Sequence, residues 1–142
     1  MAKKQRSIGV GVVWNNDRSQ ILIDRRLNEG DFANYWEFPG GKIEPGEDAP
    51  TCIRRELMEE LGITVGVGNL LVQVDHEYPN IHVSLLVHHC WLLSGVPQTI
   101  QCAEVMWVNV ADLASYNFPE ANYQIIEALQ EMAQHSHQIK LG

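Results

Sequence analysis

The segment from Gly41 to Ile63 constrains the fold more than any other part of the chain. Asp48 can cap the start of a helix, Pro50 suits the first helical turn, and Gly62 suits a left-handed exit. Three apolar residues recur at every fourth position and should form one stripe that faces a core: Ile53, Leu57 and Leu61. The sequence therefore predicts an amphipathic helix over Asp48–Leu61 with one side buried.

The same helix carries an acidic stripe beside the apolar one. Its members are Glu56, Glu59 and Glu60, and Glu47 stands just before the helix. Crowded carboxylates repel one another unless a cation compensates their charge, and oxygen ligands of this kind suit Mg²⁺ or Mn²⁺. Arg55 can orient a neighbouring carboxylate by pairing with it. The alternative is an acidic helix face that does no more than contact solvent.

The charge balance of the whole chain raises a problem that such a metal site would solve. The formal net charge is -8, with only ten Lys and Arg residues. A surface for long DNA or RNA is normally basic, so long nucleic acid is not an expected partner. A small polyphosphate substrate is itself an anion and would need local basic residues or a bridging cation. A divalent metal would neutralise phosphate charge and activate a water molecule.

The remaining pattern predicts a mixed α/β fold in one domain over residues 1–142. Five strands are expected, over Ser7–Trp14, Gln20–Arg26, Leu70–Tyr78, Ile81–Leu93 and Glu104–Val110. A second amphipathic helix is expected from Pro119 to about Gln134, followed by a loose polar tail from about His135. Strands that alternate with two helices favour helices packed on a mixed sheet.

The cysteines and the hydropathy indicate a cytoplasmic protein. The three cysteines are Cys52, Cys90 and Cys102, and no CxxC pair occurs. An odd number at wide spacing predicts free thiols in a reducing compartment. No apolar run is long enough to span a bilayer, so no membrane partner is expected. The sequence leaves the oligomeric state open.

The segment from Gly41 to Ile63 resembles the Nudix box, G-x5-E-x7-R-E-U-x-E-E-x-G-U with U aliphatic. Every defined position matches: Gly41, Glu47, Arg55, Glu56, Leu57, Glu59, Glu60, Gly62 and Ile63. A chance match is on the order of 10⁻⁹ per starting point. The resemblance implies a Nudix fold, which is an α/β/α sandwich, and hydrolysis of a nucleoside diphosphate linked to another group. It implies Mg²⁺ held by the three helix glutamates and the Gly40 carbonyl.

Two further segments resemble the MutT-type members of this family, which remove oxidised guanine nucleotides. They are Trp36–Lys42 and Phe118–Asn122. The resemblance implies that Asn122 reads the base, since its amide offers both a donor and an acceptor. It also implies that Arg26 lies near the substrate phosphates. Lys42 and Tyr78 complete the expected substrate contacts, and the ring of Tyr78 could stack on a base.

The sequence departs from the MutT pattern at two places. An acidic residue is expected six positions before Trp107, where this chain has Gln101. Glu104 is nearby and is a candidate metal ligand, although a structural role at the start of a strand is an equal alternative. An arginine is expected shortly after the Tyr-Pro turn, where this chain has Ile81. One base contact is therefore expected to be missing.

These observations favour a Mg²⁺-dependent nucleoside triphosphate pyrophosphohydrolase acting on 8-oxo-dGTP or a related nucleotide. Its products would be a nucleoside monophosphate and pyrophosphate. Glu56, positioned by Arg55, is the first candidate to orient or deprotonate the attacking water, with Glu59 beside it. Two alternatives stay open. One is a pyrimidine substrate such as dCTP, because Ile81 replaces the expected arginine, or another nucleoside diphosphate linked to a group X. The other is a non-catalytic 8-oxoguanine recognition module, although such modules tend to lose the glutamates.

Overall fold

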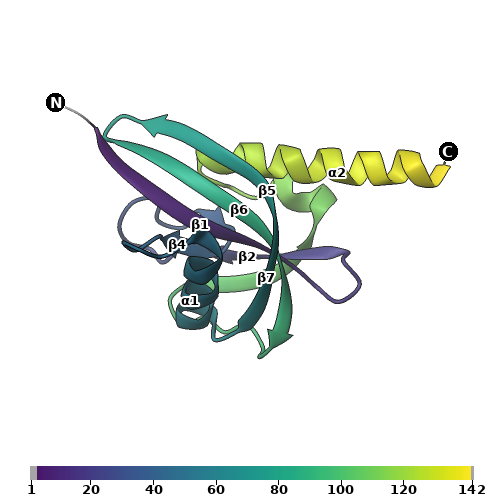
Figure 1. Cartoon of the computed structure of the whole chain (residues 1–142), viewed down its shortest axis with the longest axis horizontal. Helices are drawn as coiled ribbons and strands as arrows, with labels where there is room; N and C mark the ends of the chain where they lie inside the picture. The colour runs from purple at the N-terminus through teal and green to yellow at the C-terminus, as the bar shows by residue number, and fades with distance from the viewer. Residues whose placement is uncertain (1–2, 142) are drawn as a thin grey trace.

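The computed structural model describes residues 3–141, with side chains through Gln134. Its centre is a seven-stranded mixed sheet in the order β3-β2-β1-β6-β5, in which β4 also pairs with β1 and β7 with β2 (Figure 1). The strands are β1 (Lys4–Trp14), β2 (Gln20–Arg25), β3 (Trp36–Glu37), β4 (Gly40–Lys42), β5 (Thr64–Tyr78), β6 (Ile81–Ser94) and β7 (Glu104–Asn109). The helices are α1 (Ala49–Leu61), η1 (Val110–Ser115), η2 (Glu120–Asn122) and α2 (Tyr123–Leu141).

Strand β1 is the central strand of this sheet. It runs parallel to β6 along its whole length, from the Lys4–Ile81 pair to the Trp14–Trp91 pair. On its other side it pairs antiparallel with β4 over Ile8–Val10, in the middle of the strand, and with β2 at Trp14. The mixture of parallel and antiparallel neighbours confirms the expected mixed sheet. It also places β4 next to the middle of β1, where the candidate site lies.

Helix α1 forms as its end signals predict. The Asp48 side chain accepts a hydrogen bond of 2.8 Å from the Thr51 backbone nitrogen, which caps the first turn. The helix ends at Gly62, whose φ of 69° is left-handed and suits a residue without a Cβ atom. The apolar stripe of Ile53, Leu57 and Leu61 is fully buried. Each such side chain contributes about 1.5–3 kcal/mol relative to an exposed one.

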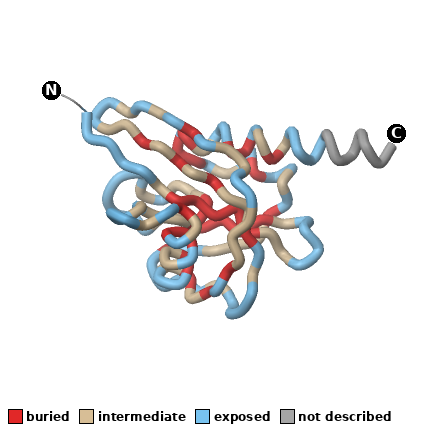
Figure 2. The backbone as a smooth tube through the Cα atoms, viewed as in Figure 1, coloured by how far each residue is buried: buried red, intermediate tan, exposed pale blue. Residues whose placement is uncertain are grey.

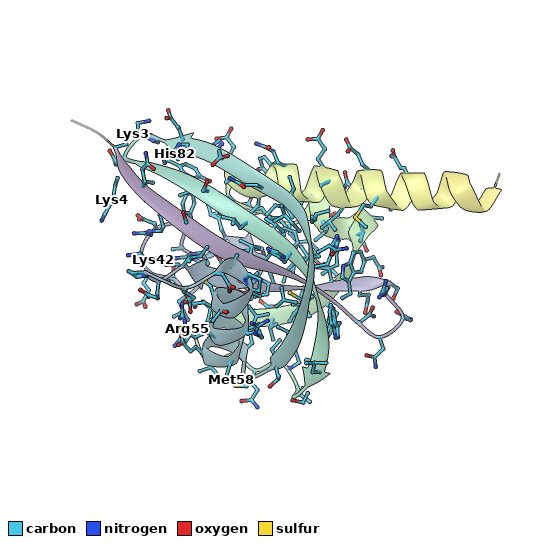
Figure 3. All side chains as sticks on the ribbon, viewed as in Figure 1. Lys3, Lys4, Lys42, Arg55, Met58 and His82 are labelled. Atoms are coloured by element: carbon cyan, nitrogen blue, oxygen red, sulfur yellow. The ribbon has the colours of Figure 1, made fainter. Side chains whose placement is uncertain are left out.

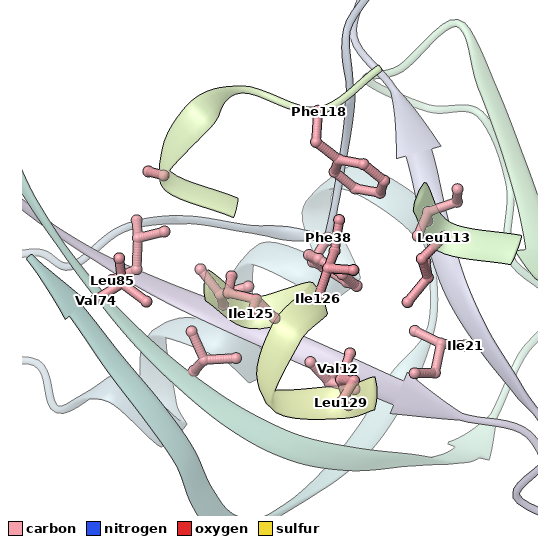
Figure 4. Packing of buried hydrophobic residues seen from close by; sticks show 14 of the residues in the cluster. Val12, Ile21, Phe38, Val74, Leu85, Leu113, Phe118, Ile125, Ile126 and Leu129 are labelled. Atoms are coloured by element: carbon pink, nitrogen blue, oxygen red, sulfur yellow. The ribbon is translucent and has the colours of Figure 1, made fainter. Parts of the chain in front are cut away.

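The sheet separates two apolar cores, which gives the expected sandwich of helix, sheet and helix. Successive side chains of β1 point to opposite faces of the sheet and so enter different cores. Val13 packs with α1, while Val12 packs on the opposite face. The α2 side holds Ile125, Ile126 and Leu129 against Val12 and the stacked rings of Phe38 and Phe118 (Figure 4). Burial is greatest through the middle of the molecule, along the sheet (Figure 2).

Three elements, β1, β5 and α2, differ from the predicted boundaries by three residues or more. Strand β1 begins at Lys4, three residues before the predicted start at Ser7. Strand β5 begins at Thr64, six residues before the predicted start at Leu70. The first half of β5 contains two glycines, so polar and apolar residues do not alternate there as they do in a half-buried strand. The pairing in this half also contains register shifts. The loose tail was predicted from about His135, and the side chains from that residue onward lie outside the described residues. The backbone of α2 reaches Leu141, and no proline or glycine interrupts it.

The structure confirms the predicted free thiols. All three cysteines are free and buried. Among the described residues, no helix combines the length and apolar character needed to cross a membrane.

Candidate active site

The acidic stripe of α1 lies against β4 and the end of β3. Glycine at position 41 makes this approach possible, because a Cβ atom there would overlap the carboxyl group of Glu56. A Cβ atom at Gly40 would overlap the carbonyl oxygen of Gly9 on β1. The two glycines therefore let strand, strand and helix meet at one point. Gly40 and Gly41 lie in strand β4, and their lack of side chains permits this close packing.

Arg55 organises the carboxylates around it. Its Nε and one terminal nitrogen donate to both oxygens of Glu47, at 2.8 and 2.9 Å. Its other terminal nitrogen donates to Glu56 Oε1 at 2.9 Å and lies 3.3 Å from Glu59 Oε2. The bidentate pair holds the pKa of Glu47 down to about 2, through hydrogen bonds from Arg55 and the Glu44 backbone. Arg55 thus fixes the orientation of Glu56 while Glu47 fixes Arg55.

Glu60 lies on the inner side of the stripe, where charge is poorly compensated. Burial, together with the neighbouring carboxyl groups of Glu37 and Glu56, raises its pKa to about 9. Burial also raises the pKa of Glu37, although the ion pair of 3.1 Å with Arg26 opposes this shift. Asp24 lies behind them, only 2% exposed, and its pKa is raised by burial and then by Glu37.

This cluster fits a divalent cation by its chemistry. Glu56, Glu59 and Glu60 supply hard oxygen donors, and Asp24 Oδ2 is buried without a hydrogen-bond partner. Excess negative charge of this kind costs free energy that a cation would recover. Among the described residues, no three acidic, histidine or cysteine side chains already converge on a single cation position. Without a cation, Arg55 and retained protons balance the charge.

A cleft of about 410 Å³ opens next to the glutamate stripe. Gly40 and Glu37 line one end of it, so the cleft and the acidic cluster share a boundary. Its floor is apolar and comes from Ile8, Val10, Phe38, Val83 and Leu85. An apolar floor with polar groups at the edge is typical of small-molecule sites.

Three of the predicted substrate residues line this cleft: Arg26, Tyr78 and Asn122. The Tyr78 hydroxyl accepts a hydrogen bond of 3.0 Å from the Ala121 backbone nitrogen, which brings η2 to the end of β5. Lys42 is the register partner of Ile8, a floor residue, and so stands on the same face of the sheet. In Figure 3, Lys4, Lys42 and Arg55 lie one below another along the left edge of the view.

Glu104 lies apart from this group. It pairs with Arg25 at 3.2 Å, and Arg25 is also its register partner on β2. Side chains alternate along a strand, so Arg25 and Glu104 share the face opposite to Asp24. Gln101 is closer to the cluster, because its backbone nitrogen donates to the carbonyl oxygen of Glu60 at 3.2 Å. The structure therefore groups Glu104 with Arg25 and brings the segment of Gln101 to the end of the acidic stripe.

Comparison with known proteins identifies the family of this arrangement. The model of the NUDIX domain matches residues 9–128. The chain belongs to the Nudix family. Its Nudix hydrolase relatives include the 8-oxo-dGTP diphosphatase of Escherichia coli strain K12, which is 35% identical over 132 residues. That alignment covers 91% of this chain and 99% of the relative.

Two further comparisons show the range of this part of the Nudix family. The CTP pyrophosphohydrolase of E. coli strain K12 is 31% identical over 116 residues, which cover 80% of this chain and 84% of the relative. A crystal structure of the MutT protein from Methanosarcina mazei Go1 superposes with a TM-score of 0.81. It is 24% identical and covers 94% of this chain and 98% of that one, which shows the shared fold.

Sequence reasoning missed several residues of the Nudix site. Asp24 and Glu37 join the acidic cluster, and Lys4 and Arg6 line the open end of the cleft. Asp24 could have been recognised as a candidate from the sequence, because an acid directly after the apolar run Ile21–Ile23 is unusual in a buried strand. Lys4 and Arg6 could not have been recognised in this way, since basic residues are common at the start of a chain. Only the pairing of β1 with β6 reveals their position.

Proposed function

We propose that this Nudix hydrolase is a nucleoside triphosphate pyrophosphohydrolase that uses Mg²⁺, or Mn²⁺ in its place. Its substrate is 8-oxo-dGTP or a related nucleotide, and its products are the monophosphate and pyrophosphate. The protein acts as one domain over residues 1–142. Clearing oxidised nucleotides from the pool in this way protects DNA. The three free thiols favour the cytoplasm as its compartment.

One observation carries this proposal. The cleft that fits a nucleoside ends at Gly40 and Glu37, where the acidic stripe of α1 begins. A nucleotide with its base and sugar in the cleft would therefore place its phosphates beside the glutamates. The name of the E. coli relative, 8-oxo-dGTP diphosphatase, points to the same chemistry. The complete glutamate set argues against a module that only recognises the base.

Each residue of the site has a role that follows from its position. Glu56, Glu59 and Glu60, with the Gly40 carbonyl, would hold Mg²⁺, which neutralises phosphate charge and favours attack at phosphorus. Glu56 is the candidate to orient and deprotonate the attacking water, because Arg55 fixes one of its oxygens at 2.9 Å. Arg26 and Lys42 bind phosphate oxygens at the two sides of Gly40.

The other end of the cleft binds the nucleoside. Tyr78 packs on the base, and Phe32 supports its ring at a centroid distance of 5.2 Å. The Asn122 amide hydrogen-bonds to the base edge. The apolar floor excludes water from both contacts.

A pyrimidine nucleotide such as CTP or dCTP is a second candidate substrate. Ile81 lines the cleft at the position where the MutT resemblance predicts an arginine, so one base contact differs. The E. coli relative named CTP pyrophosphohydrolase shows that similar chains include a pyrimidine enzyme. The chemistry at the glutamates would be unchanged.

The test is pyrophosphate release from a panel of 8-oxo-dGTP, dGTP, dATP, dCTP and CTP, with Mg²⁺ and with EDTA. We expect metal-dependent turnover, with the highest kcat/KM for 8-oxo-dGTP. A preference for CTP or dCTP would move the assignment to the second candidate. Absence of turnover on every nucleotide, in a folded protein saturated with Mg²⁺, would overturn the proposed activity.

A further inference from the structure

The end of the cleft that is remote from the glutamates carries two cations on one face of β1. Lys4, Arg6, Ile8 and Val10 all line the cleft, since every second residue of a strand points to the same side. Their register partners on β6 include Ile81 beside Lys4 and Val83 beside Arg6. The neighbouring β6 residues therefore offer these cations no acceptor.

Arg6 has all of its side-chain donors available for a ligand, whereas Arg26, the other cleft arginine, already uses some of its donors within the protein. Arg26 donates to Glu37 at 3.1 Å and to the backbone carbonyl of Asp31 at 3.1 Å. Within the described side chains, Arg6 forms no hydrogen bond or ion pair with the protein. A guanidinium group beside an apolar floor, with five donors and no hydrogen-bond partner in the described part of the protein, is suited to an acceptor on the ligand.

The position of Arg6 along β1 separates it from the phosphate end. Gly40 pairs with Val10, and Arg6 lies four residues earlier, about 13 Å along the strand at about 3.3 Å per residue. Asn122 and Tyr78 are held together at the same remote end, because η2 is hydrogen-bonded to Tyr78 and Tyr78 pairs with Ile81. A nucleotide with its phosphates at Gly40 would therefore present its base, and not its phosphates, to Arg6.

We propose that Arg6 is a specificity-determining residue that donates hydrogen bonds to a carbonyl oxygen on the nucleobase. The inference rests on the proposed function, because it requires a nucleotide in this cleft. Guanine, 8-oxoguanine and cytosine each carry an exocyclic oxygen, whereas adenine carries an amino group that donates. Arg6 accordingly selects bases with an oxo group and disfavours adenine. It supplies from β1 a donor that Ile81 cannot supply from β6.

The experiment compares kcat/KM for the best oxo-base nucleotide and for dATP in wild type and Arg6→Leu. We expect Arg6→Leu to lower the oxo-base value by about 10–100-fold and the dATP value by less than about 3-fold. Arg6→Lys should fall between the two, because it keeps a donor without the planar fork. Arg18→Leu is the matched control, since Arg18 is exposed in the turn between β1 and β2 and does not line the cleft, and its selectivity should equal that of wild type.

Three outcomes would overturn the inference. An equal loss for all nucleotides would place Arg6 on the sugar or phosphates, and no loss would make it a solvated cation of the strand. If wild type hydrolyses nothing, the proposed function fails, and calorimetry with 8-oxo-dGMP, dCMP and dAMP decides the inference separately. Base-dependent binding that Arg6→Leu removes would support the inference, and binding without base preference would overturn it.

Discussion

The two ends of the site solve opposite electrostatic problems. At the glutamate end, carboxyl groups are crowded and partly buried, and Arg55 together with raised pKa values limits their repulsion. At the base end, Lys4 and Arg6 stand beside an apolar floor with no carboxylate paired to them among the described side chains. The first end is arranged to receive a cation and the second to receive hydrogen-bond acceptors. A metal-bound nucleotide supplies both, so each end is completed by a different part of one ligand.

The largest expected effect is at the glutamate end. Glu60→Gln should lower kcat/KM by about 10³-fold, because a neutral amide is a poor Mg²⁺ ligand. The same change should stabilise the metal-free protein, since it removes a carboxyl group whose pKa is raised to about 9 by burial and neighbouring acids. Steady-state kinetics and thermal unfolding in EDTA measure both effects on one variant.

Glu44→Gln is the matched control for that variant, because Glu44 is exposed and touches the cluster only through its backbone. Its activity and melting temperature should stay close to wild type. If Glu60→Gln keeps full turnover, the glutamate end is not a metal site, and the contrast between the two ends disappears.

The next effect tests whether the glutamate end depends on arginine geometry. Arg55→Lys should lower kcat and weaken Mg²⁺ binding, together by about 10–100-fold, because lysine cannot form the fork to Glu47 while also orienting Glu56. Titration of activity against Mg²⁺ separates the two parameters. Glu47→Gln should shift them in the same direction, and independent effects of the two variants would contradict a shared network.

A smaller and selective effect is expected at the base end. Asn122→Ala should lower kcat/KM for the preferred nucleotide about tenfold through loss of base hydrogen bonds. The Mg²⁺ concentration at half-maximal activity should not change, because Asn122 lies at the end of the cleft away from the glutamates. A nucleotide panel at several Mg²⁺ concentrations tests both statements. A shift in the Mg²⁺ requirement would show that the two ends are not separate.

The smallest effect is on stability as a function of pH. The folded-state pKa of Glu60 is about 9, against 4.5 for an unperturbed glutamate, so between these values the folded chain keeps a proton that the unfolded chain releases. The free energy of unfolding should therefore fall as pH rises from 5 to 9 without metal. Denaturant titrations in EDTA measure this slope, which should be shallower in Glu60→Gln.

At low pH, Glu47 makes the free energy of unfolding change with pH in the opposite direction. Its pKa is about 2 when folded, so the stability that it contributes is present above about pH 4.5 and is lost as the pH falls. Together with Glu60, this places the maximum stability of the metal-free protein near pH 5. A maximum at pH 8 or above would contradict the buried state of Glu60.

The glutamate end could be predicted from sequence because its residues are neighbours along one helix. Helical periodicity places Glu56, Glu59 and Glu60 on one stripe, and the cap residues set the bounds of α1. The base end could be predicted only in part. Asn122 came from resemblance and Tyr78 from its aromatic ring. Lys4 and Arg6 were missed because their importance depends on a parallel pairing with a strand some 77 positions later, as in Lys4–Ile81.

Helix α1, its caps, its buried stripe and the chemistry of its acidic stripe could be derived from sequence. The reason is that residues three or four positions apart in a helix are neighbours in space whatever the rest of the fold. Three placements came from the assembled fold alone: Glu37 and Asp24 join those acids, Glu104 pairs with Arg25, and Arg6 faces the cleft. These placements depend on which strands lie side by side. Strand order is set by the packing of the whole core, so no local pattern contains it.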